Sequence, residues 1–149
     1  MKYRHTFVVD APPQEVAAFH TRATSLQAIT PPFVPMRLQS APDEMDDGDE
    51  MEFTLWLGPV PVRWRARIED SSPGGFVDRQ VSGPFAAWAH RHTFVPLDGG
   101  ATQVVDEVDA RLRRHLLWGP AGLAMWLGLP ILFAYRGWRT RRLLGHGSA

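Results

Sequence analysis

The sequence contains no cysteine, and this absence removes several functions at once. Without thiols the chain has no disulfides, no thiolate metal ligands and no cysteine nucleophile. An excess of charge of either sign is also missing, because 16 Lys and Arg balance 16 Asp and Glu and the formal net charge is zero. The balance argues against nucleic acid as the main partner, since such partners select strongly basic surfaces.

The first ten residues lack the long apolar run of a signal peptide and carry charges at Lys2 and Arg4. We therefore expect a cytoplasmic protein, with peripheral membrane contact left open. A chain of 149 residues has the length of one domain with one sizeable core, so residues 1–149 are expected to form a single domain. No acidic residue follows Asp109, whereas arginines continue to Arg142.

Alternation of apolar and polar residues predicts a protein made mainly of strands. The first strand is expected over residues 3–10, and two short helices over 14–20 and 24–29, with Asp10 as a candidate helix cap and Pro31 ending the second helix. Six more strands are predicted, at residues 34–40, 50–57, 60–69, 76–81, 87–95 and 102–112. Within 60–69 the alternation of apolar residues with Arg63, Arg65 and Arg67 is typical of a sheet with one wet face.

The strand over residues 87–95 carries an unusual face. Trp88, His90, His92 and Phe94 share one parity, so two imidazoles lie between two aromatic rings. This face is typical of a cavity that is mostly apolar but has a few polar groups to orient a ligand. Asp106 lies on the next strand, beyond a turn at residues 98–100, and should come to rest roughly opposite His90 or His92.

Residues 116–135 contain no charge and have arginines on both sides. Their length approaches that of a membrane span, but Pro130 and several glycines favour the core helix of a soluble fold, bent at Pro130. The apolar residues circle this helix, so one side should need a second subunit or a lipid surface. The candidates for the uncovered side are Trp118, Met125, Leu129 and Leu132, and those for a headgroup contact are Arg136, Arg139, Arg141 and Arg142.

The order of elements and three sequence segments resemble the START-like, helix-grip superfamily, including its birch-pollen-allergen-like, lipid-transfer and polyketide cyclase/dehydrase branches. The segments are residues 7–16, with Asp10-Ala11-Pro12-Pro13, residues 83–94, with Gly83-Pro84-Phe85, and residues 99–108, with Gly99-Gly100 and Asp106. The resemblance implies an α+β fold in which a curved antiparallel sheet wraps a long C-terminal helix, with two short helices after the first strand. It also implies an apolar cavity between sheet and helix. It does not settle function, because the superfamily contains carriers, sensors and enzymes.

The first function hypothesis is therefore binding of a small or mid-sized apolar ligand, such as a lipid or an aromatic polyketide-like molecule. Its candidate contacts are Trp64, Trp88, Phe94, Gln80, Phe53 and Trp126. The second hypothesis is a cyclase/dehydrase-type enzyme with His90, His92 and Asp106 as acid/base groups, because a carboxylate can orient an imidazole and raise its basicity. The same three residues could instead form a self-satisfied buried network.

The C-terminal helix and the His-x-His pair each allow one further interpretation. A third function hypothesis is a membrane-associated or protein-interaction module that works through the C-terminal helix, as a homodimer or at a membrane surface. A His-x-His pair can also bind a metal with a third ligand such as Asp106 or His5, but no fourth ligand is evident, so neither a metal nor a cofactor is expected.

Overall fold

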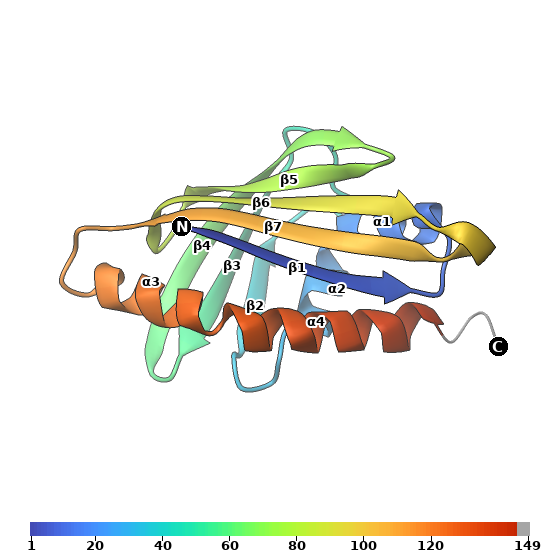
Figure 1. Cartoon of the computed structure of the whole chain (residues 1–149). Coiled ribbons are helices and arrows are strands. Elements are labelled where there is room, and N and C mark those ends of the chain that lie inside the picture. The colour runs from blue at the N-terminus through green and yellow to red at the C-terminus, as the bar shows by residue number, and fades with distance from the viewer. Residues whose placement is uncertain (146–149) are drawn as a thin grey trace.

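A computed structural model describes residues 1–145, in which seven antiparallel strands form one curved sheet (Figure 1). The strands are β1 (Lys2–Val9), β2 (Met36–Ser40), β3 (Glu50–Leu57), β4 (Val60–Ser72), β5 (Gly75–Ser82), β6 (Phe85–Pro96) and β7 (Thr102–Leu112). Their order across the sheet is β1-β7-β6-β5-β4-β3-β2, so the first strand pairs with the last. The fold is α+β, as expected, and residues 146–149 of the expected single domain lie outside the described residues.

Four α-helices accompany the sheet. Two short ones, α1 (Pro13–Thr21) and α2 (Ala23–Ala28), follow β1. The other two, α3 (Trp118–Leu127) and α4 (Leu129–Leu144), run in succession along the open side of the curved sheet, and α4 lies beside β1 (Figure 1). The expected cap at Asp10 is wrong, because α1 begins three residues later, at Pro13, with Pro12 at its N-cap. Proline is favoured at the first helical position because the N–H that it lacks would have no partner there.

The alternation on β4 separates the two faces of the sheet. Val62, Trp64, Ala66 and Ile68 are buried, whereas Arg63, Arg65 and Arg67 are exposed. On the outer face Arg65 pairs with Glu52 and Arg67 with Glu50 of β3. Pairs this exposed contribute little to stability, so the free energy of folding comes from the inner face and not from these ions.

A register shift between β6 and β7, at Phe85 and Ala87, decides which residues of β6 point inward. Phe85 and Trp88 differ in parity, yet both are buried, because the irregular pairing lies between them. Beyond it the register is regular from Ala87 to Pro96. The inward parity of residues 88–94 is therefore the one expected from simple alternation.

The C-terminal apolar segment forms two helices in place of the single long helix expected. The chain breaks at Gly128, and the axes of α3 and α4 differ by 50°. Pro130 lies in the first turn of α4, where its missing N–H is tolerated. The expected bend is present, but it takes the form of a new helix start that lets α4 continue to Leu144.

The prediction of which side of these helices is left uncovered was wrong. Leu129 is buried and Met125 and Leu132 pack against the core, so these residues face the sheet. The exposed apolar residues of α3 and α4 are instead Leu123, Leu127, Ile131, Trp138 and Leu143. Within residues 1–145 no single helix is long and apolar enough to cross a membrane, although the bent pair α3 and α4 is so by length and composition.

Gly75 allows β5 to start close against β6. Its φ is 149°, and a Cβ there would collide with the carbonyl oxygen of His92. We expect Gly75→Ala to lower the free energy of unfolding by about 2 kcal/mol or more, because the backbone of β6 must move away. Urea unfolding measures it against Gly74→Ala, whose Cβ meets only the Ser72 Oγ at 3.7 Å. Equal stability of the two variants would contradict this account of the β4–β5 turn.

Candidate functional site

The inner face of β6 carries the four residues singled out in the sequence. Trp88, His90 and Phe94 are 9%, 2% and 3% exposed, and the His92 side chain is 11% exposed. The two imidazoles are in contact, with ring centroids 3.8 Å apart. Two titratable side chains are therefore enclosed among aromatic rings, where any charge must be balanced locally.

Asp106 of β7 supplies part of that balance. It lies directly opposite His92 in the β6–β7 register. Its Oδ1 is 2.8 Å from His90 Nε2, which gives the expected hydrogen bond, and 3.2 Å from His92 Nδ1. The second contact is close but is not a hydrogen bond, and His92 Nδ1 has no hydrogen-bond partner among the described residues. Since an ionised carboxylate only accepts hydrogen bonds, His90 must carry its proton on Nε2.

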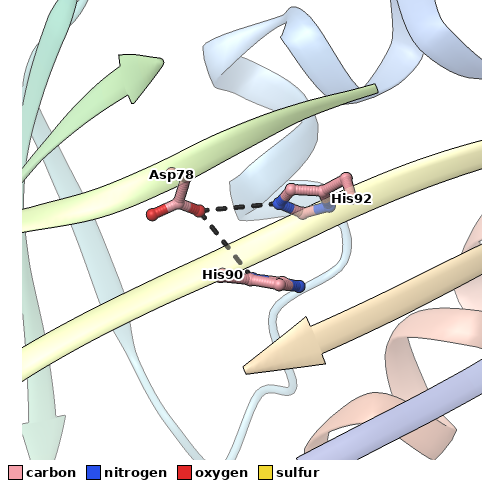
Figure 2. Close-up of side chains that lie close together, drawn as sticks. All are labelled: Asp78, His90 and His92. Carbon is pink, nitrogen blue, oxygen red and sulfur yellow. Dashed lines mark ion pairs between the residues drawn. The ribbon is translucent and has the colours of Figure 1, made fainter. Parts of the chain in front are cut away.

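Asp78 of β5 completes the cluster and was not singled out from the sequence. It pairs with His90 across β5–β6, and its Oδ2 is 3.8 Å from His90 Nδ1 and 3.6 Å from His92 Nε2 (Figure 2). Each imidazole thus has one nitrogen toward Asp106 and the other toward Asp78. Asp78 shares parity with Gln80, which was selected, so the alternation on this strand was the signal that could have found it.

The two histidines differ in protonation. Burial lowers the pKa of His92, but the carboxylates of Asp106 and Asp78 outweigh burial and raise it to about 9. For His90, burial and the neighbouring His92 prevail over the carboxylates, and its pKa is lowered. The pKa of Asp106 is also lowered, because its close contacts with the two histidines outweigh burial. At neutral pH, His92 is charged, His90 is neutral and Asp106 is ionised.

A third histidine closes the far end of the cluster. The His20 ring of α1 lies 5.7 Å from the His92 ring, and its Nδ1 is 2.8 Å from the carbonyl oxygen of Val16. A carbonyl only accepts hydrogen bonds, so Nδ1 carries a proton. Burial and the charge on His92 lower the pKa of His20 to about 4, and it stays neutral beside the charged ring.

The described residues that could hold a metal ion are Asp78, His90 and His92, whose nearest ligand atoms lie within 4.8 Å of one another. Two imidazoles and one carboxylate are a donor set found for divalent transition metals. Of the third ligands expected from the sequence, Asp106 faces the opposite nitrogens of the two rings, and His5 lies across from Asp106 on β1. A proton on His92 occupies the same position that a metal would need.

A cavity of about 280 Å³ lies between the sheet and the C-terminal helices and ends on this cluster. Of the expected ligand contacts, Phe53, Trp64 and Trp88 line it, and His90 and Asp78 do too. The helices contribute Met125, Leu129, Leu132, Phe133 and Arg136. The wall is therefore apolar except at one end, as expected from the parity of β4 and β6.

The other expected ligand contacts lie outside the cavity wall. Gln80 closes the β5–β6 turn, with its side-chain amide donating to the carbonyl of Phe85 and accepting from the Phe85 N–H. Phe94 packs against Phe76 and the His20 ring, and Trp126 packs edge-on against Tyr3. These three side chains stabilise the frame around the cavity and do not face its interior.

Arg136 lies at the cavity and not at the surface expected from the sequence. It was grouped with Arg139, Arg141 and Arg142 as a headgroup contact, but it lines the cavity from α4 and stacks against Phe133, with Cζ 5.7 Å from the ring centroid. Arg139 donates to the carbonyl of Ala28, so only Arg141 and Arg142 remain exposed. Helical spacing carries the information, since Leu129, Phe133 and Arg136 recur on one face.

Comparison with known proteins gives a consistent answer on fold. No protein-family model and no curated protein matches this sequence. Among solved structures, protein TTHA0849 from Thermus thermophilus superposes with a TM-score of 0.71 and 16% identity over 100% of both chains. The Zhui aromatase/cyclase from a Streptomyces species superposes with a TM-score of 0.69 and 19% identity, over 96% of this chain and 95% of that one.

A third similar structure is the nucleoside-diphosphate sugar epimerase from Corynebacterium glutamicum, with a TM-score of 0.70 and 27% identity. The match covers 94% of this chain but only 28% of that one. Together with the curved sheet and the C-terminal helices, these likenesses show that the chain has the START-like, helix-grip fold.

The Asp106 contacts give a stability prediction. We expect Asp106→Asn to lower the free energy of unfolding by about 1–3 kcal/mol, because the variant leaves a charged imidazole with one carboxylate in place of two. A histidine whose folded pKa is raised stabilises the fold below its usual pKa of 6.5, and this stability is lost as pH rises toward about 9. The variant should therefore lose less stability than the wild type between pH 6.5 and 9.

Chemical denaturation at several pH values tests this prediction. The matched control is Asp109→Asn, which removes an exposed carboxylate from the same strand. If the two variants have equal stabilities and the same pH dependence, the carboxylate of Asp106 does not stabilise the protonated form of His92.

Proposed function

We propose that this protein binds a small, mainly apolar ligand in the cavity between the sheet and the C-terminal helices. The observation that carries the proposal is a cavity whose walls are aromatic and aliphatic and whose one end is polar. Its volume of about 280 Å³ is just below the ~300–1,000 Å³ of cavities that take drug-sized ligands. A ligand of modest size, with most of its surface apolar, fits this space.

The mouth of the cavity supports the same proposal. Phe33, in the loop before β2, and Ile131 of α4 both line it, and they are 65% and 64% exposed. Large apolar side chains exposed together around an opening are typical of ligand-binding grooves. They would contact a ligand as it enters and cover it once it is bound.

The alternative function is cyclase/dehydrase-type catalysis at the polar end of the cavity. His90 is neutral, and its Nε2 proton is held by Asp106, so the lone pair on Nδ1 can act as a base. It would take a proton from a carbon between two carbonyl groups, and the carbanion would attack another carbonyl carbon of the same molecule. The new alkoxide would take that proton back and become a hydroxyl group. For dehydration, His90 would remove the remaining proton from the attacking carbon and pass it to the hydroxyl group, so that the C–O bond breaks, a C=C bond forms and water leaves. The similar Zhui protein is an aromatase/cyclase, which favours keeping this alternative.

Native mass spectrometry of the purified protein tests the binding proposal. We expect a co-purified apolar molecule that is lost in Met125→Trp, because the indole would fill the cavity from α3. The matched control is Leu123→Trp, two residues away on the same helix but 43% exposed, which should keep the ligand. Wild-type protein that carries no ligand and takes up no apolar probe would contradict binding. Loss of water from the ligand on incubation would favour the enzyme.

We also propose that the exposed apolar residues of the C-terminal helices form a contact surface on a cytoplasmic protein, with a second subunit as the favoured partner and a membrane surface as the alternative. Leu127 and Ile131 are 70% and 64% exposed on adjacent helices. With Arg136 and Arg139 turned away from solvent, the basic residues exposed here are too few to favour anionic lipid strongly.

The double variant Leu127→Gln/Ile131→Gln tests this surface by light scattering and liposome flotation. We expect a wild-type dimer and a monomeric double variant, because apolar area drives such association. The control is Leu143→Gln, which removes an exposed leucine near the end of α4. Wild-type protein that is monomeric and ignores anionic liposomes would exclude both partners.

A further inference from the structure

The guanidinium of Arg136 is the least satisfied polar group at the cavity. Its Nε is shut off from solvent, and within residues 1–145 the side chain makes no hydrogen bond and no ion pair. Its one close partner is the face of the Phe133 ring. A guanidinium has five N–H donors in a rigid fork, and leaving them unused in an enclosed site is costly.

The surrounding charges explain how the residue stays charged. Burial lowers the pKa of Arg136, but Asp106 and Asp78 oppose this at longer range. An arginine remains protonated in proteins even when its pKa falls. The charge is therefore balanced at a distance, whereas the donors that face the cavity are not satisfied by the chain.

The polar and the apolar residues that line the cavity lie in different parts of its wall, and the unused N–H donors of Arg136 belong to the polar part. Asp78, His90 and Arg136 line the cavity where the sheet is buried, with His90 2% exposed, whereas Phe33 and Ile131 are 65% and 64% exposed and mark its open side. A molecule with one polar group and an apolar remainder would bury its polar group first. Its apolar part would extend along Trp64 and Leu132 toward the mouth.

We propose that the ligand of this cavity carries a single carboxylate that binds Arg136, so that the ligand class is a small apolar carboxylic acid. A planar carboxylate can accept two parallel hydrogen bonds from the guanidinium fork, which neither a hydroxyl nor an ester can match. The inference rests on the proposed binding function and deepens it. The neutral His90 beside this position offers a second polar contact.

The test compares three probes of one chain length, decanoate, decanol and methyl decanoate, by calorimetry at fixed pH and salt. We expect the wild type to bind decanoate at least about tenfold more tightly than the two neutral probes. Arg136→Gln should lose this preference and bind all three with similar affinity, while Arg136→Lys should restore part of it. Arg141→Gln, an exposed arginine on the same helix, is the matched control and should behave as the wild type.

The outcomes separate the two proposals. If the wild type binds the neutral probes as tightly as decanoate, or if Arg136→Gln keeps the preference, the carboxylate inference is wrong while apolar binding stands. If no probe binds, the binding function itself is contradicted. Circular dichroism checks that each variant is folded, and if Arg136→Gln does not fold, the wild-type preference among the three probes decides.

Discussion

The buried carboxylate of Asp106 organises the interior of this molecule. It lies on β7 and contacts two imidazoles of β6, which in turn face Asp78 on β5. Three neighbouring strands are thus joined by titratable side chains that are largely removed from water, with the Asp78 side chain 20% exposed and that of Asp106 6% exposed. A buried charge that loses its partner is far more destabilising than one at the surface, so a slip of register between these strands would be strongly disfavoured. The polar cluster therefore fixes the wall on which the cavity is built.

The cavity itself results from two departures from regular structure. The sheet is curved with α3 and α4 along its open side (Figure 1), and the chain turns by 50° at Gly128 between the two helices. Met125 on one side of the turn and Leu132 on the other then line the same space. A straight helix would follow a curved sheet less closely, and the apolar walls would no longer meet around one enclosed volume.

Much of the fold was predictable because it depends on local patterns. The strands β3 and β7 have the bounds given by alternation, and the β6–β7 hairpin follows from the turn at residues 98–100. The inward face with His90 and His92 followed from parity alone, since the irregular pairing lies earlier, at Phe85 and Ala87. The geometry of the C-terminal helices was harder to predict. Gly128 and Pro130 indicate that the helix is interrupted, but they do not determine whether it bends or ends and begins again.

The candidate site was predictable only along single strands and across one short hairpin. Asp106 could be placed because one short turn joins its strand to β6, and two-residue errors in such a hairpin still leave the side chains close. Asp78 pairs with His90 across β5–β6, and Arg136 shares one face of α4 with Leu129 and Phe133, but neither pattern by itself says that the polar side chain lines a cavity. Gln80 shows the converse error, because correct parity does not tell a cavity wall from a side chain that closes a turn.

Because the chain breaks at Gly128, two separate helices, α3 and α4, each contribute part of the cavity wall. Because the residues lining the cavity from α3 and α4 belong to separate hydrogen-bonded helices, the interior volume depends on the angle between them as well as on which side chains are present. Substitutions near this break would resize the cavity while leaving the sheet and its charged cluster unchanged. The same scaffold could in this way accommodate ligands of different length by altering one angle, with its polar end held constant.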